Sequence, residues 1–297
     1  MTIETLSGEL AAVVEANAES VVRVEGRPRG ASSGVVWSAE GIVLASHHAV
    51  DMEEAPVGLA DGRTVPAKVV GRDPGRDLVV LRVDAPGIVP PRWGAASEAR
   101  VGQLVVGLSR PGRAVRAQLG IVSAVAGPWR APSGGRLERY LESDLALHPG
   151  FSGGLLLGVD GAGLGANTAG LLRGTSLAVP AETLRLVVEA VLARGRVRRG
   201  YLGIGTQPVA LTSDLRGRLG QTSALIVLSV QPESPAARAG LLLGDVLLKA
   251  GGEALTHPGA LLPALDEERV GQEVGFEVLR AGQNLSVPVV VGERTAG

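Results

Sequence analysis

Hydrophobic residues along this chain fall into short runs separated by glycine, proline and polar residues, a pattern typical of β-strands. In the first part of the chain these runs cover residues 21–24, 34–37, 41–44, 78–83, 103–108, 120–125 and 154–158. After residue 200 they cover residues 201–204, 224–230, 245–249, 275–280 and 284–291. No regular alternation with helices is visible, so the pattern predicts barrels or sandwiches and not a parallel βα sheet.

Helical periodicity is confined to a few segments. Residues 3–16 bring four apolar side chains to one face, and residues 181–193 are apolar-rich and followed by Gly195, a suitable C-cap. Residues 234–239 and 258–265 predict two shorter helices. The basic, glycine-flanked stretch 194–200 then indicates a domain boundary.

The length of 297 residues fits two domains. We therefore expect an N-terminal helical segment (1–18), a first domain (19–195), a linker (196–199) and a second domain (200–293).

The amino-acid composition argues against several classes of function. The net charge of −1 and an aromatic content of 2% argue against a nucleic-acid binder. The chain has no cysteine, and its four histidines lack the spacing of a helical zinc pair, so we expect neither metal nor cofactor. No apolar stretch is long enough to predict a membrane span.

The start of the chain lacks the features of a signal peptide, which predicts a cytoplasmic protein as written. A periplasmic or cell-envelope location is the alternative if an export segment has been removed.

With no thiol available, a serine is the natural nucleophile to seek. Ser152 lies between Gly150 and the pair Gly153-Gly154, which permits an exposed hydroxyl and converging backbone N–H groups. A serine hydroxyl needs a base, and the base needs an acid to orient it. His48 follows a predicted strand, and Asp77 directly precedes another. We therefore predict a catalytic triad of His48, Asp77 and Ser152.

Longer segments around these three residues resemble the HtrA/Deg serine proteases. They are 33–36, 41–50, 73–81, 143–154, 164–169 and 177–180. In the second domain, the segments 199–204, 234–241 and 243–247 resemble the PDZ domain that follows the protease domain in this family. The resemblance covers nearly the whole chain, with the motifs in order. It implies a mainly β fold, with a chymotrypsin-like double β-barrel protease domain followed by a PDZ domain.

The resemblance also implies roles for individual residues. His48 is the expected general base, Asp77 its orienting acid and Ser152 the nucleophile, with the N–H groups of Gly150 and Ser152 forming the oxyanion hole. The primary substrate pocket is expected to be formed by Ala146, Leu147, Ser176, Leu177 and Ala178, all uncharged. In the PDZ domain, the N–H groups of Leu202, Gly203 and Ile204 are expected to bind a peptide's C-terminal carboxylate.

The implied activity is that of an ATP-independent serine endopeptidase in protein quality control. Its partners would be unfolded or damaged polypeptides, and peptide C-termini in the PDZ groove. A homotrimer is a candidate assembly, although the N-terminal segment lacks the aromatic residues that often make the family's trimer contacts.

Four departures from the family pattern stand close to the predicted triad. Phe151 and His148 replace asparagines, Leu155 replaces a proline, and Ala45-Ser46 replaces threonine-asparagine. A bulky ring at position 151 could disturb the oxyanion hole. The alternative function is therefore a catalytically silent peptide-binding or chaperone-like protein, and a third is a scaffold that binds no peptide.

Three other features favour ordinary structural explanations. His47 lies one place off the motif and is expected to be structural, and His257 is expected at the surface or a groove edge. Residues 161–166 fit a loose dinucleotide fingerprint, but no helix is predicted after them to hold a pyrophosphate.

Overall fold

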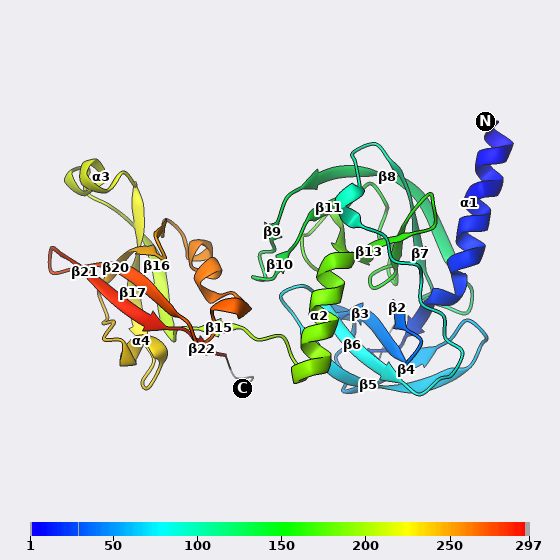
Figure 1. Cartoon of the computed structure of the whole chain (residues 1–297), viewed down its shortest axis with the longest axis horizontal. Helices are drawn as coiled ribbons and strands as arrows, with labels where there is room; N and C mark the ends of the chain where they lie inside the picture. The colour runs from blue at the N-terminus through cyan, green and yellow to red at the C-terminus, as the bar shows by residue number, and fades with distance from the viewer. Residues whose placement is uncertain (1, 29, 295–297) are drawn as a thin grey trace. The chain divides into compact units, whose positions relative to one another are not determined.

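The computed structural model describes residues 2–28 and 30–294, which form two compact units. The first unit ends at Val197 and the second begins at Arg198. Figure 1 traces both units, and each is described here by itself.

The first unit begins with a closed barrel in the strand order β1-β2-β3-β6-β5-β4. Its strands are β1 (Val21–Val24), β2 (Ser32–Ser38), β3 (Ile42–Ser46), β4 (Glu54–Gly58), β5 (Thr64–Asp73) and β6 (Leu78–Val83). Strand β6 is apolar almost throughout because both of its faces are buried. Val79 and Leu81 fill the barrel interior, whereas Leu78 and Val80 face a core shared with the second barrel.

The second barrel has the strand order β11-β14-β13-β12-β7-β8. Its strands are β7 (Leu104–Ser109), β8 (Arg116–Ala126), β11 (Tyr140–Ser143), β12 (Leu155–Gly158), β13 (Gly163–Thr168) and β14 (Ser176–Pro180). A small hairpin of β9 (Trp129–Arg130) and β10 (Arg136–Leu137) lies between β8 and β11 in the chain. The shared core thus holds two barrels together, and residues at their junction come from both.

Two helices flank the barrels. Helix α1 (Ile3–Asn17) and the 3-10 turn η1 (Ala18–Ser20) precede β1, and α1 packs Leu10, Val13 and Val14 on an apolar cluster between the barrels. Helix α2 (Ala181–Arg194) lies against β5, β6 and β13 and ends at Gly195, whose φ is +72°. Figure 1 shows α2 running along the barrels.

The second unit is built on an open sheet in the order β16-β17-β18-β20-β21, with β19 paired to β18. Its strands are β15 (Gly200–Tyr201), β16 (Ile204–Ala210), β17 (Ser223–Val230), β18 (Val246–Ala250), β19 (Glu253–Ala254), β20 (Glu273–Arg280), β21 (Gln283–Val290) and β22 (Gly292–Glu293). Its helices are α3 (Ser213–Leu219), α4 (Pro235–Arg238) and the 3-10 segments η4 (Pro258–Leu265) and η5 (Glu267–Arg269). Strand β16 is an edge of this sheet, which leaves one side free for another strand.

The predicted fold class is confirmed: the chain is mainly β, with two closed barrels followed by a smaller domain. Residues 201–204 are not one strand, since Leu202 and Gly203 interrupt β15 and β16. Residues 258–265 form a 3-10 helix with Pro263 inside it, where an α-helix would lose a hydrogen bond. Helix α3 was not predicted, because its sequence carries little apolar periodicity.

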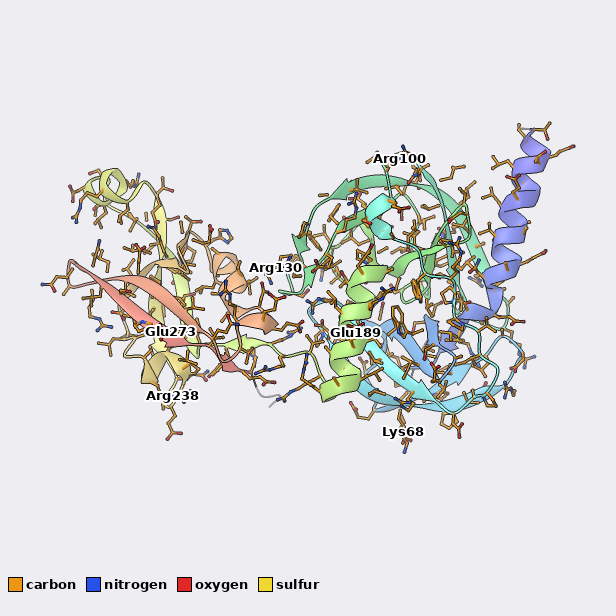
Figure 2. The ribbon with its side chains drawn as sticks, in the orientation of Figure 1. Lys68, Arg100, Arg130, Glu189, Arg238 and Glu273 are labelled. Atoms are coloured by element: carbon orange, nitrogen blue, oxygen red, sulfur yellow. The ribbon has the colours of Figure 1, made fainter. Side chains whose placement is uncertain are left out.

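The outer surface carries charges of both signs. Lys68, Glu189 and Glu273 project from β5, α2 and β20 into solvent (Figure 2). Among the described residues, no helix combines the length and the apolar character required to cross a membrane.

Candidate active site

The pairing of β3 with β6 brings His48 and Asp77 together. The antiparallel register joins Ser46 to Leu78, so the residues that follow β3 lie beside the residue that precedes β6. The short 3-10 turn η2 (His47–Ala49) then presents the His48 ring. The His48 Nδ1 atom lies 2.7 Å from the Asp77 Oδ2 atom, and the His48 N–H donates to Asp77 Oδ1 at 2.9 Å. One carboxylate therefore fixes both the ring and the backbone of the histidine.

Asp77 is built to stay ionised. Its side chain is only 5% exposed, and it also accepts a hydrogen bond from the Thr168 hydroxyl at 2.5 Å. Burial acts to raise the pKa of the Asp77 carboxyl, but hydrogen bonds from His48 and Thr168 hold it below its ordinary value. An ionised carboxylate can only accept, so His48 Nδ1 carries the proton and Nε2 is free to act as a base.

The chain turns sharply to deliver Asp77. Its φ is +56°, in the left-handed region that aspartate tolerates better than most residues. The preceding turn is fixed by Asp73, whose Oδ1 accepts from the Gly75 N–H and whose Oδ2 pairs with Arg76 at 2.8 Å. The hairpin β9–β10 supports the same turn, since the Ser133 hydroxyl donates to the Gly75 carbonyl at 2.8 Å.

Ser152 is delivered to the same place by the second barrel. The Gly153 N–H donates to the Asn167 carbonyl, so Ser152 lies beside the end of β13. Thr168 contacts Asp77 there, and the Ala169 N–H donates to Ser152 Oγ at 3.2 Å. The three predicted triad residues thus surround one segment, 168–170.

Gly170 shows how tightly this segment packs. A Cβ atom at that position would lie 2.6 Å from both Asp77 Oδ2 and His48 Nδ1. Among the described residues, no hydrogen bond joins Ser152 Oγ to the His48 ring; the hydroxyl instead accepts from Ala169. A hydroxyl that accepts a hydrogen bond keeps its own hydrogen, so the Ser152 hydroxyl can still donate.

The loop before Ser152 forms a type II β-turn. The Phe151 N–H donates to the His148 carbonyl at 3.0 Å, Pro149 occupies the second position, and Gly150 has a φ of +91°. A type I turn would require a negative φ at Gly150 and would reverse the peptide that carries its N–H group. In the described part of the chain, the N–H groups of Gly150 and Ser152 donate to no residue. Both are therefore available to an oxyanion.

The side chain of Phe151 is buried, although the residue belongs to this turn. Only 2% of the residue is exposed, and its ring meets His148 edge-on with centroids 6.3 Å apart. The type II turn, with its positive φ at Gly150, is formed with this ring in place. Whether the ring affects the oxyanion hole stays a question for the activity assay.

His47 differs in character from its neighbour. Its backbone N–H donates to the Asp77 carbonyl at 3.0 Å, and its buried Nδ1 atom has no partner among the described residues. Burial and the nearby Arg72 charge lower the pKa of the His47 ring, although Asp77 and Asp73 oppose the shift. The structural role expected for His47 stays a prediction.

The residues predicted for the substrate pocket lie on two adjoining segments. Ala146 is exposed and its carbonyl accepts from the Gln118 side chain at 2.9 Å, whereas Leu147 is half-buried. The Ser176 hydroxyl donates to the carbonyl of Leu145, which joins the two segments. Leu177 packs into the core between the barrels, and Ala178 into the core of the second barrel.

The predicted carboxylate-binding loop of the second unit is a tight turn between β15 and β16. Leu202 is buried, and its carbonyl accepts from the Ala236 N–H at 3.0 Å. The Gly203 carbonyl accepts from the Gln231 N–H at 2.8 Å. Within the described residues, the N–H groups of Leu202 and Gly203 have no acceptor, and Ile204 begins the edge strand.

Two residues at the site were not identified from the sequence. Thr168 lies in a segment that resembles the family, but nothing in its local sequence indicated a bond to Asp77. The Ser33 hydroxyl donates to the Gly150 carbonyl, although the two residues are 117 positions apart in the chain. Such contacts depend on barrel closure and leave no short-range signal.

Comparisons with known proteins agree with this architecture. The model of the trypsin-like peptidase domain matches residues 32–165, and that of the PDZ domain matches residues 200–291. A probable periplasmic serine endoprotease DegP-like from Halomonas elongata is 32% identical over 272 residues, covering 89% of this chain and 57% of the relative. The chloroplastic protease Do-like 1 of Arabidopsis thaliana is 32% identical over 285 residues, covering 89% of this chain and 64% of the relative. The chain therefore spans only about three fifths of the length of these relatives.

Solved structures match over nearly the full length. HtrA-type protease AlgW with a tripeptide is 31% identical with a TM-score of 0.75, and covers 97% of this chain and 98% of that one. The same protease with a decapeptide has 28% identity and a TM-score of 0.77, with 97% and 99% covered. The family resemblance predicted from the sequence is confirmed. The chain belongs to the HtrA-type serine proteases, with a trypsin-like peptidase domain followed by one PDZ domain.

Proposed function

We propose that this chain is an ATP-independent serine endopeptidase that cleaves unfolded or damaged polypeptides. The observation that carries the proposal is the hydrogen bond between His48 and buried Asp77, with Ser152 bound to the adjoining segment. The type II turn at Gly150 adds two unpartnered N–H donors. A base, its orienting acid, a nucleophile and an oxyanion site are the parts that acyl transfer requires.

The chemistry follows from these parts. Ser152 Oγ attacks the carbonyl carbon of the scissile peptide, while His48 Nε2 takes its proton. The oxygen of the tetrahedral intermediate accepts from the Gly150 and Ser152 N–H groups. His48 then protonates the leaving amine, and the C–N bond breaks to leave an ester on Ser152. Water then attacks that ester with His48 again as base, the ester bond to Ser152 Oγ breaks to release the new carboxyl group, and His48 returns the proton to Oγ. Asp77 stabilises the imidazolium in both steps.

The second unit is proposed to bind the C-termini of peptides. Strand β16 has a free edge, and the adjacent turn presents N–H groups without partners among the described residues. A peptide can add to this edge as a strand, with its carboxylate on the N–H groups of Leu202, Gly203 and Ile204. The structures of HtrA-type protease AlgW with a decapeptide and with a tripeptide support peptide binding in that protein.

Specificity at the cleaved position is proposed to favour small or medium apolar side chains. The predicted pocket residues carry no charge, and Ser176 uses its hydroxyl on the Leu145 carbonyl. A homotrimer remains the proposed assembly, and light scattering on the purified chain would measure it.

Labelling with a fluorophosphonate probe tests the catalytic proposal directly. The wild-type chain should be labelled and should degrade unfolded casein without nucleotide, whereas Ser152→Ala should do neither. The assay should be run both with and without a peptide that ends in an apolar residue, because the second unit is proposed to bind peptide C-termini. If the wild-type chain neither reacts nor cleaves in any arm but still binds the peptide, the catalytically silent peptide-binding function replaces this proposal.

A further inference from the structure

Two hydrogen bonds from Ser33 hold the loop that carries the oxyanion donors. It lies on β2 with no exposed surface. Its hydroxyl donates to the Gly150 carbonyl at 2.6 Å, and its backbone N–H donates to the Ser152 carbonyl at 3.2 Å. Both carbonyls are therefore bound on the side of β2, while the N–H groups of the same two residues remain unpartnered among the described residues.

Arg110 fixes the Ser33 hydroxyl in this orientation. The Arg110 backbone N–H donates to Ser33 Oγ at 2.8 Å, so the hydroxyl hydrogen is left to point at Gly150. The next residue, Pro111, packs on the turn so closely that a Cβ atom on Gly150 would lie 2.4 Å from its Cβ. The bond to Ser33 and the packing of Pro111 thus come from one short segment at the end of β7.

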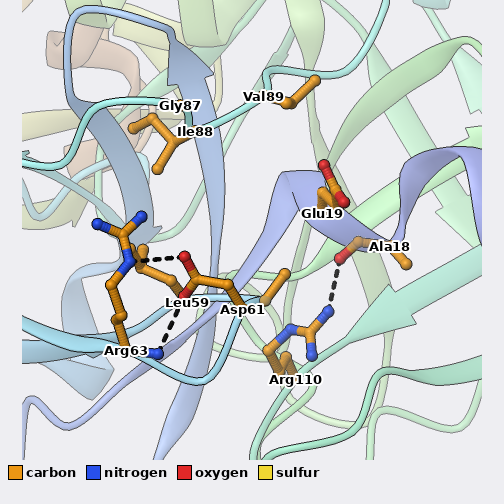
Figure 3. A pocket seen from close by; sticks show the side chains of 10 residues that line it. Ala18, Glu19, Leu59, Asp61, Arg63, Gly87, Ile88, Val89 and Arg110 are labelled. Atoms are coloured by element: carbon orange, nitrogen blue, oxygen red, sulfur yellow. Dashed lines mark hydrogen bonds and ion pairs between the residues drawn. The ribbon is translucent and has the colours of Figure 1, made fainter.

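The Arg110 side chain anchors that segment to the start of the first barrel. Its guanidinium donates to the carbonyls of Ala18, Val21 and Arg113, each at 2.7 Å, and the residue is 5% exposed. Figure 3 shows its bond to Ala18 at the wall of a cavity of about 310 Å³.

That cavity presents no surplus of positive charge. Glu19 and Asp61 line it together with Arg63, and Asp61 pairs with Arg63 at 2.6 Å. The charges around the cavity therefore do not indicate that the buried Arg110 binds an anion. They favour an anchoring role, in which Arg110 ties η1 and β1 to the segment that contacts the turn.

The side chain at position 151 cannot replace the Ser33 contact. Phe151 is buried and apolar, so it offers the turn packing but no hydrogen bond from its side chain. The polar side-chain contact to the turn therefore comes from Ser33, which holds the Gly150–Phe151 peptide directly beside the Pro149–Gly150 peptide that carries the oxyanion donor. Without it, the Gly150 carbonyl would lose its partner, and leaving a partly buried acceptor without a hydrogen bond costs stability.

We propose that the Ser33 hydroxyl, oriented by Arg110, is a positioning residue that keeps the Gly150 N–H directed into the oxyanion hole. The inference rests on the proposed endopeptidase function and deepens it. It also makes the oxyanion site dependent on the seating of the residues that follow α1, because Arg110 is anchored on Ala18 and Val21.

The test compares Ser33→Ala with Ser109→Ala. Ser109 is also a fully buried serine, at the end of β7, and its hydroxyl has no partner among the described residues. Ser33→Ala should lower kcat for a peptide substrate by about 10- to 100-fold and change KM by less than about threefold. Affinity for a peptide boronic acid, which forms a tetrahedral adduct, should fall by a similar factor. Ser109→Ala should leave all three quantities near the wild-type values.

A crystal structure of each variant examines the turn without relying on turnover. Gly150 should keep its positive φ in Ser109→Ala and lose it, wholly or in part, in Ser33→Ala. If Ser33→Ala does not fold, Ser33→Cys fills nearly the same space with a weak donor, and the same changes should appear at smaller size.

Unchanged kcat and an unchanged turn in the folded Ser33 variant would overturn the inference. Equal losses in the Ser33 and Ser109 variants would also overturn it, because a general packing defect would then explain both. A wild-type chain without activity, combined with a turn that reverses in Ser33→Ala, would refute only the endopeptidase proposal and would uphold the positioning role.

Discussion

Replacement of Thr168 by valine is expected to weaken the acid of the triad without removing it. Valine has nearly the shape of threonine but lacks the hydroxyl that donates to Asp77 Oδ2 at 2.5 Å. The carboxylate keeps its two bonds from His48, at 2.7 and 2.9 Å. Thr168 is itself only 1% exposed, so water has little access to the position of the lost donor.

The size of the effect follows from these contacts. A hydrogen bond to a charged group contributes about 1.5–3 kcal/mol. Asp77 is ionised both before and during the reaction, so only part of this energy belongs to the transition state. We therefore expect kcat/KM for Thr168→Val to fall by about tenfold, equivalent to about 1.4 kcal/mol. The remaining energy of the hydrogen bond should appear as a lower free energy of unfolding.

The pH dependence of that stability loss gives a second measurement. The Thr168 bond helps to hold the pKa of Asp77 below its ordinary value, so its contribution is fully present above that ordinary value. It disappears as the pH falls through the lowered pKa. The difference in unfolding free energy between wild type and Thr168→Val should therefore be largest near neutral pH and shrink in acid.

Thr183→Val is the matched control for this prediction. Thr183 is buried on α2, and its hydroxyl accepts from the Glu138 N–H at 2.9 Å. This change should lower stability but leave kcat/KM within about twofold of wild type. The reasoning fails if the two threonine variants lose kcat/KM equally, or if Thr168→Val retains full kcat/KM.

Three further predictions concern other contacts. Gly170→Ala should lower kcat by at least about a hundredfold, because the new Cβ would lie 2.6 Å from both Asp77 Oδ2 and His48 Nδ1; kcat close to wild type in steady-state kinetics would contradict this. Asp77→Asn should lower kcat by about 10⁴-fold, since an amide can hold His48 in the wrong tautomer; a loss below tenfold would show that the carboxylate is not needed. Asp245→Asn should destabilise the PDZ domain, because buried Asp245 accepts from Arg280 at 2.7 Å. Burial acts to raise the pKa of Asp245 but hydrogen bonds hold it low, so this loss should be present at neutral pH and vanish in acid, as urea titrations at both pH values would measure.

Local sequence features predicted those parts of the fold that depend on neighbouring residues. Helices α1 and α2 and the end of α2 at Gly195 were predicted because periodicity and a C-cap are short-range signals. Strands β4 and β5 were not, because alternating polar residues and Pro66 mask their apolar face. At the site, the three triad residues could be proposed from residue type and chain order. Their positioning partners could not, because Thr168 and Ser33 reach the site only through pairings formed when the barrels close.

The unusual residues around Ser152 are compatible with catalysis for a physical reason. The oxyanion donors are main-chain N–H groups, so the turn needs a residue that adopts positive φ at Gly150 more than it needs particular side chains beside it. His148 is exposed and Phe151 is buried. Leu155, in place of a proline, lies fully buried in β12 within the cluster beneath α1. Each substitution therefore changes a side chain, whereas the donors that acyl transfer needs belong to the backbone of Gly150 and Ser152.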